Sequence, residues 1–272
     1  MADSTMNIND AYQLANHLLE FGNIYQAELL YNKILMVDSN FLDGKVMFLT
    51  KLLSDNHQVK HAYRWLVSTS NDYLIEKRIP WFSFDATDFL NTYLSNLPVS
   101  NPLVLEYGSG GSTLYFAKNN ASVISIEHDS SWYNTLDKYI SKYTNIDYIN
   151  IQPEMVENAT QQADPSNPWL YQSADRKYIN YKFIRYVSKI DDYPDSYFNI
   201  ISIDGRARAS CIMHSIKKVK VGGIIILDDS DREYYTKNTW QYLTGFIRRD
   251  FYGAKPITNF YSRTSIYIRI DE

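Results

Sequence analysis

Residues 104–113 read Val-Leu-Glu-Tyr-Gly-Ser-Gly-Gly-Ser-Thr, and this stretch decides the fold of the chain. The apolar run over 103–107 predicts a buried strand, and the glycines after it predict a tight turn that leads directly into a helix over 112–119. Glycine has no Cβ atom, so this backbone can approach a ligand closely, and the first amides of the helix can bind it. The stretch therefore predicts a loop that cradles a small ligand.

An acidic residue strengthens this interpretation. Glu127 stands at the end of the next predicted strand, 19 positions after Gly108, where its carboxylate can accept both hydroxyls of a ribose. A nicotinamide dinucleotide requires a Gly-x-Gly-x-x-Gly turn for its pyrophosphate, but Thr113 stands where the third glycine is needed. We therefore expect a nucleoside ligand without a pyrophosphate.

From residue 101 onward, short β-rich runs alternate with helical patterns. Strands are expected at 103–107, 123–127, 148–151, 198–204 and 224–228, and helices at 112–119, 131–143, 208–219 and 232–248. Two further runs, 256–260 and 265–270, predict a terminal antiparallel hairpin. The alternation predicts an α/β fold: a doubly wound, mostly parallel, seven-stranded sheet.

The N-terminal part has apolar residues at helical spacing over 11–68, which predicts one or two helical hairpins. Its small and large residues resemble a tetratricopeptide repeat, with Ala15 where glycine is usual and Ser39 where proline is usual. Such repeats bury their faces against neighbours, so this part is expected to pack on the rest of the chain or on a second subunit. A peptide-binding module and a purely structural extension both stay open.

We expect three parts: a helical region over 1–70, a connecting segment and helix over 71–100, and a cofactor-binding domain over 101–272. In the connecting segment, Asp85 is expected to be the N-cap of a helix that ends before Pro98.

Composition places the chain among ordinary globular proteins. Of its 272 residues, 45% are hydrophobic and 21% are charged. The net charge of −4 is not the basic footprint typical of nucleic-acid binding, and no apolar run approaches the roughly 20 residues that span a bilayer. We expect a soluble, cytoplasmic protein. Cys211 is the single cysteine, which excludes an internal disulfide, and we expect it to be buried in a helix.

Four motifs in order resemble the class I S-adenosylmethionine (SAM) dependent methyltransferases. They are the first-motif loop at 106–112, the second strand end at 126–129, the Ile-Asp-Gly of 203–205, and the Gly-Gly of 222–223 leading into 224–229. The resemblance spans 101 to the C-terminus and implies SAM as the cofactor. The expected terminal hairpin suits it too, since this family closes its sheet with an antiparallel strand.

The resemblance also implies roles for single residues. The loop glycines approach the methionyl part, Glu106 helps to hold its ammonium group, and Glu127 takes the ribose hydroxyls. His128 either lines the adenosine pocket or only hydrogen-bonds its neighbours. The implied cofactor-binding residues are Glu106, Gly108, Ser109, Gly110, Gly111, Ser112, Glu127 and His128.

Acidic residues end two later strands. Asp204, Asp228 and Asp229 should face the crevice beyond the carboxyl ends of the strands, where one of them could act as a general base. They also resemble the acidic triad of metal-dependent O-methyltransferases, which makes a magnesium ion possible. Arg206 and Arg208 could instead neutralise these carboxylates in a salt-bridge network. The sequence leaves a metal open.

We expect SAM-dependent O-methylation of a small molecule or glycan by in-line transfer, with a carboxylate assisting. The aromatic segment 152–186 is expected to shape the acceptor pocket, or else to be a solvated loop. A non-catalytic interaction protein, which uses its helical repeat beside an inactive methyltransferase-like scaffold, is the alternative, and a nicotinamide oxidoreductase is a third. Self-association or a protein partner is possible through the N-terminal helices.

Overall fold

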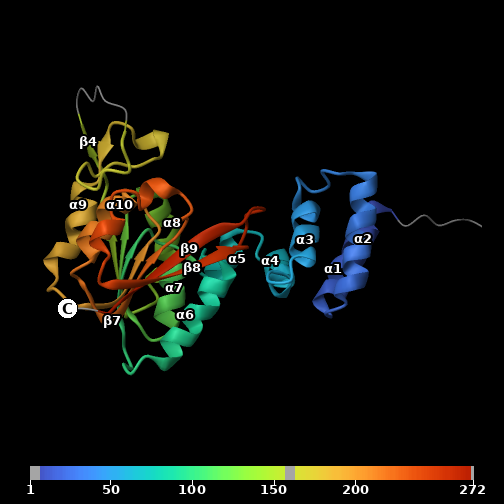
Figure 1. Ribbon diagram of the computed structural model, residues 1–272, viewed down its shortest axis with the longest axis horizontal. Coiled ribbons are helices and arrows are strands. Elements are labelled where there is room, and N and C mark those ends of the chain that lie inside the picture. Colours follow the sequence, from blue (N-terminus) through green and yellow to red (C-terminus); the bar gives the residue numbers. More distant parts are fainter. Residues whose placement is uncertain (1–6, 157–162, 271–272) are drawn as a thin grey trace, which may run out of the picture. The chain divides into compact units, whose positions relative to one another are not determined.

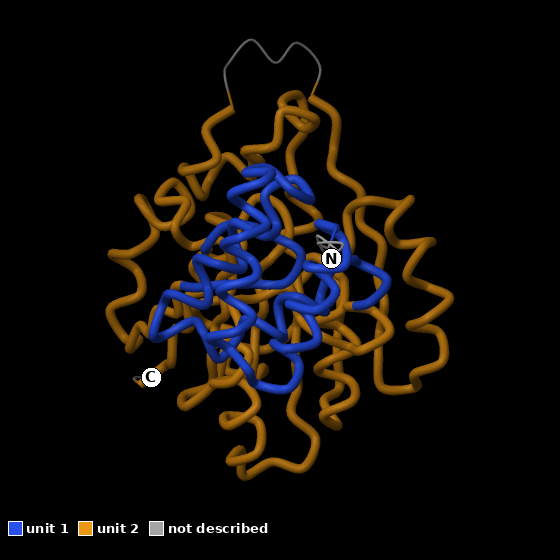
Figure 2. The backbone as a smooth tube through the Cα atoms, turned by 90° about the vertical axis from the view of Figure 1, so that its right-hand side faces the viewer, with its two compact units in different colours: residues 1–73, 253–261 blue, residues 74–252, 262–272 orange. Residues whose placement is uncertain are grey.

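The chain folds into two units, and each unit is made of two segments that alternate along the sequence. The computed structural model describes residues 7–156 and 163–270. The first unit comprises residues 1–73 and 253–261, and the second comprises 74–252 and 262–272 (Figure 2). The connection between the last two strands thus belongs to the helical unit, although the expected boundaries at 70 and 100 assign it to the cofactor-binding domain.

The second unit is built on a sheet with strand order β3-β2-β1-β6-β7-β9-β8, counted over the described residues. The strands are β1 (Leu103–Tyr107), β2 (Ser122–Glu127), β3 (Ile146–Asn150), β6 (Phe198–Ile203), β7 (Val219–Leu227), β8 (Phe246–Gly253) and β9 (Ser262–Arg269). The first five pair in parallel, whereas β9 is antiparallel to β7. This is the doubly wound order 3-2-1-4-5-6 with a final antiparallel strand inserted before the last position. The predicted fold class is confirmed.

Helices cover both faces of this sheet, which explains why its central strands are apolar on both sides. On one face, Val104, Ile200 and Ile224 pack against α6 (Phe84–Asn96) and α7 (Gly111–Lys118). On the other, Leu105, Ile201 and Ile225 face α9 (Ile184–Ser188) and α10 (Arg208–Ser215) (Figure 1). Cys211 is fully buried in α10, as expected.

The remaining elements of this unit are short. They are α8 (Ser130–Ile140), the two-stranded ribbon of β4 (Glu154–Met155) and β5 (Tyr181–Lys182), and the 3-10 turns η2 (Arg176–Tyr178) and η3 (Lys189–Asp192). No helix of the described ranges is long and apolar enough to cross a bilayer.

The predicted helix over 232–248 is wrong. The chain instead forms two 3-10 turns, η4 (Glu233–Tyr235) and η5 (Trp240–Tyr242), and then enters β8. The ring of Tyr235 lies 4.9 Å under the guanidinium of Arg208, and this contact holds the turn against the core. Residues 246–248, which the helical spacing assigned to the helix, instead belong to β8, the edge strand beside β9.

The predicted strand over 256–260 is also wrong, whereas the run over 265–270 corresponds to β9. Ile257 has a positive φ of 68°, which is incompatible with a strand, and its amide donates to the carbonyl of Ser68 at 2.9 Å. Asp85 is not an N-cap either. Ser83 precedes α6, and Asp85 lies in its first turn, where the helix dipole favours an acid.

The first unit is helical. Its elements are α1 (Ile8–Glu20), α2 (Ile24–Val37), α3 (Lys45–Ser54), η1 (Val59–His61) and α4 (Ala62–Val67), and α5 (Asn71–Lys77) spans the boundary. Ala15, Ala27 and Tyr31 are fully buried between α1 and α2. Residues 253–261 complete this core: Trp65 donates to the carbonyl of Thr258 at 2.6 Å. The resemblance to a tetratricopeptide repeat stays a prediction.

Candidate functional site

The glycine-rich turn lies where β1 ends, between β2 and β6, at the point where the strand order reverses. Gly108 has φ +91°, and a Cβ there would lie 2.8 Å from the Cα of Gly205. A Cβ on Gly111 would lie 2.1 Å from the carbonyl oxygen of Ile79. Gly110 differs, because its backbone is extended and the nearest described atom, Oγ of Ser112, is 4.0 Å away. Packing therefore requires Gly108 and Gly111, whereas Gly110 faces open space.

Glu127 is tied directly to this loop. One carboxylate oxygen, Oε2, accepts from the amide of Ser109 at 3.0 Å and from its hydroxyl at 2.9 Å. The other, Oε1, accepts from the amides of His128 and Asp129, both at 2.8 Å. Burial alone would raise the pKa of Glu127, but the interactions with His128, Asp129 and Ser109 outweigh it and lower the pKa. The buried carboxylate is therefore held ionised beside the loop.

Glu106 is hydrogen-bonded to residues beside the loop, and its expected role in holding the ammonium group stays a prediction. It is fully buried, and its Oε2 accepts from the hydroxyls of Thr113 at 2.5 Å and Ser125 at 2.9 Å. Thr113 in turn accepts from the amide of Gly110 at 3.0 Å. Burial raises the pKa of Glu106 to about 7, against the effect of hydrogen bonds from Ser112, Thr113 and Ser125. The threonine in place of a third glycine thus links Glu106 to the backbone of the loop.

Two aromatic residues hold the loop from the other side, and the sequence interpretation missed both. Trp132 donates its indole N–H to the carbonyl of Ser109 at 2.9 Å, and the hydroxyl of Tyr148 lies 2.9 Å from that of Ser109. Tyr133 stacks on Tyr148 with ring centroids 4.2 Å apart. A signal existed for Trp132, because it lies in the first turn of the helix that follows Glu127.

His128 stands in an aromatic cluster. Its Nδ1 is 2.9 Å from Oε1 of Glu127, and its ring meets the edges of Tyr178 and Tyr186 at centroid distances of 5.3 and 5.9 Å. Tyr178 and Tyr186 come from the aromatic segment expected to shape an acceptor pocket, but both are buried here. Trp169 of that segment is 59% exposed, and residues 157–162 lie outside the described residues.

The three predicted acids do meet. Carboxylate oxygens of Asp204, Asp228 and Asp229 all lie within 4.8 Å of one another. Asp229 has φ +48°, so the chain has already turned after β7 and brings this side chain back to the cluster. Asp228 accepts from Thr264 at 2.7 Å, and Asp229 accepts from the hydroxyl of Ser262 at 3.0 Å. Asp228 is only 1% exposed, whereas the side chain of Asp204 is 24% exposed.

Of the two arginines expected near these acids, Arg208 enters the cluster and Arg206 pairs elsewhere. Nη2 of Arg208 lies 2.9 Å from Oδ1 of Asp204 and 3.7 Å from Oδ2 of Asp229. Arg206 instead contacts Asp175 at 3.1 Å. Arg232 adds a second guanidinium, 3.1 Å from Oδ2 of Asp229.

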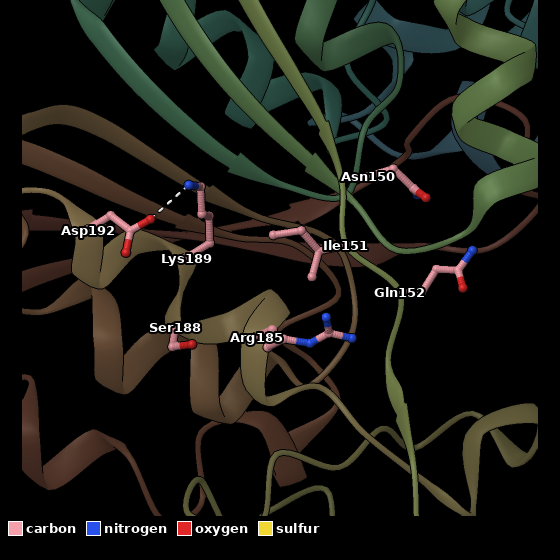
Figure 3. Close-up of a pocket in the computed structure, with 7 residues that line it drawn as sticks. All are labelled: Asn150, Ile151, Gln152, Arg185, Ser188, Lys189 and Asp192. Atoms are coloured by element: carbon pink, nitrogen blue, oxygen red, sulfur yellow. Dashed lines mark hydrogen bonds and ion pairs between the residues drawn. The ribbon is translucent and has the colours of Figure 1, made fainter.

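A polar pocket of about 530 Å³ opens beside the carboxyl end of β3 (Figure 3). Asn150, Ile151 and Gln152 line it from the strand end. Arg185, Ser188, Lys189 and Asp192 line it from α9 and η3. The amide of Asn150 also donates to the carbonyl of Glu127 at 3.0 Å, so the pocket adjoins the end of β2.

Solved structures with the same fold include methyltransferases. The O-methyltransferase TomG from Streptomyces achromogenes, involved in tomaymycin synthesis and solved in complex with SAM, aligns with 78% of this chain and 96% of its own at 10% identity and a TM-score of 0.50. A candidate O-methyltransferase from Klebsiella pneumoniae aligns with 80% of this chain and 96% of its own at 12% identity and a TM-score of 0.50. No family model and no curated protein matches the sequence. The chain therefore has the fold of class I SAM-dependent methyltransferases.

Proposed function

We propose that this chain binds SAM at the loop 108–111 and transfers its methyl group to an oxygen acceptor. The observation that carries the proposal is the open face of Gly110 beside an ionised Glu127, at the switch point of the sheet. A Cβ on Gly108 or Gly111 would meet backbone atoms, so Gly110 is the glycine of the loop that a ligand can approach most closely. The likeness to TomG, whose structure holds SAM, supports the choice of cofactor.

The residues present fit such a ligand. The first amides of α7 have no acceptor within the helix and can meet the methionyl carboxylate. Glu127 can take ribose hydroxyls if the hydroxyl of Ser109 releases Oε2, and that hydroxyl already has a second neighbour in Tyr148 at 2.9 Å. Exchange of one neutral donor for another keeps the buried carboxylate satisfied.

Asp204 is the acid best placed to assist the transfer. SAM supplies an activated methyl group on its sulfonium, so alignment of the acceptor oxygen provides much of the acceleration. As the new oxygen–carbon bond forms and the sulfur–carbon bond breaks, Asp204 accepts the hydroxyl proton of the acceptor. Asp228 and Asp229 are more buried than Asp204 and are assigned to shaping the cluster rather than to the proton transfer.

A small, hydroxyl-rich acceptor, such as a sugar or glycan, suits the surroundings best. The polar pocket beside β3 offers the side-chain amides of Asn150 and Gln152 and the charged group of Arg185. Amide and guanidinium groups donate hydrogen bonds to hydroxyl oxygens, so they suit a hydroxyl-rich molecule better than an apolar one.

Calorimetric titration with S-adenosylhomocysteine and, separately, with NAD tests the cofactor. We expect S-adenosylhomocysteine to bind and NAD not to bind. Binding of NAD without binding of S-adenosylhomocysteine would favour the third interpretation, a nicotinamide oxidoreductase.

Binding of neither would favour the alternative, a non-catalytic interaction protein. Two observations speak for that alternative: the donors of the chain itself already saturate Glu127, and the N-terminal helices expose apolar side chains, with Phe21 67% and Met36 87% exposed. Such helices could hold a protein partner or a second copy of the chain.

A further inference from the structure

Three carboxylates lie close enough together to suggest a site for a divalent cation. Asp204, Asp228 and Asp229 supply hard oxygen ligands within 4.8 Å of one another, which is the donor set that magnesium and manganese prefer. A cation bound there would need oxygen ligands at roughly 2.0 to 2.6 Å. Whether an ion fits depends on what already occupies the centre of the cluster.

Arg208 occupies it. Its residue is 3% exposed, and its Nη2 approaches the carboxylate of Asp204 at 2.9 Å and that of Asp229 at 3.7 Å. Burial alone would lower the pKa of Arg208, but Tyr235 and the three aspartates raise it above the usual value, so the guanidinium stays charged. A dication on the same oxygens would lie a few ångströms from this fixed positive charge, and their repulsion is strong in a buried site.

Several contacts hold the guanidinium of Arg208 in place. Its Nε, Nη1 and Nη2 donate to the carbonyls of Gly205, Asp228 and Asp204 at 3.0, 2.6 and 2.9 Å. The ring of Tyr235 covers it from η4 at 4.9 Å. Moving Arg208 out to admit an ion would break three charge-assisted hydrogen bonds to backbone carbonyls.

We propose that Arg208 is a permanent internal cation that replaces a divalent ion at this cluster and positions Asp204 toward the crevice. Nη2 bonds both the carbonyl and the carboxylate of Asp204, which fixes the side chain relative to its own backbone. Arg208 thus acts through Asp204 and is a positioning residue. This second role rests on the proposed methyl transfer, whereas the exclusion of a divalent ion does not.

A titration of the full chain with Mn²⁺ alone tests whether the cluster excludes a divalent ion. Binding is measured as the decrease in the electron paramagnetic resonance signal of free Mn²⁺. The full chain should bind no Mn²⁺ at the cluster. Arg208→Gln removes the buried guanidinium and leaves Arg232, which is more exposed, as the remaining cation beside Asp229, so it should bind Mn²⁺ at least about tenfold more tightly than the wild type. Arg208→Lys keeps the charge and should still exclude the ion.

Arg206→Gln is the matched control. It removes an arginine two positions away that pairs with Asp175 and not with the cluster, so Mn²⁺ binding should stay as in the wild type. Wild-type binding of Mn²⁺ that Asp204→Asn abolishes would overturn the proposal, even if Arg208→Gln fails to fold. A folded Arg208→Gln chain that gains no affinity for Mn²⁺ would overturn it as well.

Activity provides a second and separable measurement. If methyl transfer is found, a chelator should leave it unchanged in the wild type, and Arg208→Lys should lower kcat while the affinity for S-adenosylhomocysteine stays the same. Loss of activity on chelation that Mg²⁺ restores would contradict the proposal. If the chain binds no S-adenosylhomocysteine, the proposed function fails, but the Mn²⁺ comparison still decides the role of Arg208.

Discussion

Glu127 and Asp229 are both buried carboxylates that follow strands of the same sheet, yet the chain stabilises their charges differently. The amides of Ser109, His128 and Asp129 donate to Glu127, and the imidazole Nδ1 of His128 lies 2.9 Å from it. Two guanidinium groups approach Asp229, from Arg232 at 3.1 Å and Arg208 at 3.7 Å. Dipoles preserve the net negative charge of a site, whereas cations cancel it. The difference separates a carboxylate suited to attract hydroxyl donors from one committed to internal structure.

The largest effect is expected at the arginine-held cluster, on catalysis. Asp204→Asn removes the least buried of the three acids and should lower kcat by about a hundredfold or more, the usual scale of general-base catalysis, with little change in cofactor affinity. Steady-state kinetics at saturating SAM measures it. Asp195→Asn, an exposed acid paired with Lys218, is the control and should keep full turnover. Full activity in Asp204→Asn would make the whole cluster structural.

Substitutions at two neighbouring glycines test the loop beside Glu127. Gly111→Ala places a methyl group against the carbonyl of Ile79 and should destabilise the fold by about 3 kcal/mol, measured by urea unfolding. Gly110→Ala projects its methyl group into open space, so it should fold normally but bind S-adenosylhomocysteine less well. Equal cofactor affinity in Gly110→Ala and the wild type would place the ligand somewhere else.

Cofactor affinity should distinguish the two carboxylates directly. Glu127→Ala should weaken binding of S-adenosylhomocysteine by about 1 to 3 kcal/mol through loss of charged hydrogen bonds. Asp229→Asn should leave that affinity unchanged, because arginines and not the ligand use this carboxylate. Calorimetry on both variants is sufficient. If the two substitutions weaken binding equally, the proposed difference between Glu127 and Asp229 is wrong.

The remaining effects concern pH. The lowered pKa of Glu127 means that its stabilising contribution is present above the unfolded value of 4.5 and is lost as the pH falls through the folded value. Glu106 has the opposite sign: its folded pKa of about 7 lies above 4.5, so the fold loses stability as the pH rises between these values. Glu106→Gln should remove that slope, a change of about 2 to 3 kcal/mol in the free energy of unfolding between pH 4.5 and 7.

Urea unfolding at several pH values checks both signs. The stability difference between the wild type and Glu106→Gln should grow from pH 4.5 to 7 in favour of the variant. A flat difference over that range would mean that Glu106 is ionised normally beneath the loop.

The loop and Glu127 could be predicted because their geometry is local. A strand, a glycine turn and a helix N-terminus follow one another directly in the sequence, and the next strand end lies 18 residues after Ser109. The acids at 204, 228 and 229 followed from the same rule that strand ends meet at one edge. The alternation of strands and helices was sufficient to predict the doubly wound, mostly parallel sheet, but not the order of its strands.

The partners of these acids could not be predicted in the same way. Thr264 reaches Asp228 from 36 residues further along, and Ser262 reaches Asp229 from 33 residues further along, through a strand that pairs antiparallel to β7. Whether Arg206 or Arg208 would enter the cluster depended on the left-handed turn at Ala207. The helix expected over 232–248 failed for a similar reason, because Tyr235 packs on a distant arginine. Helical spacing carries no information about such contacts.

The place of residues 253–261 in the helical unit has a consequence for synthesis. A ribosome adds roughly 5 to 20 residues per second, so about 10 to 40 seconds pass between residue 73 and residue 253. During that time the amide of Gln58 lacks the backbone N–H of Ala254, and the indole of Trp65 lacks the carbonyl of Thr258. The core of the helical unit therefore stays incomplete until residues 253–261 are made, by which time seven of the eight strands that precede β9 in the chain, and most of the eighth, have been made.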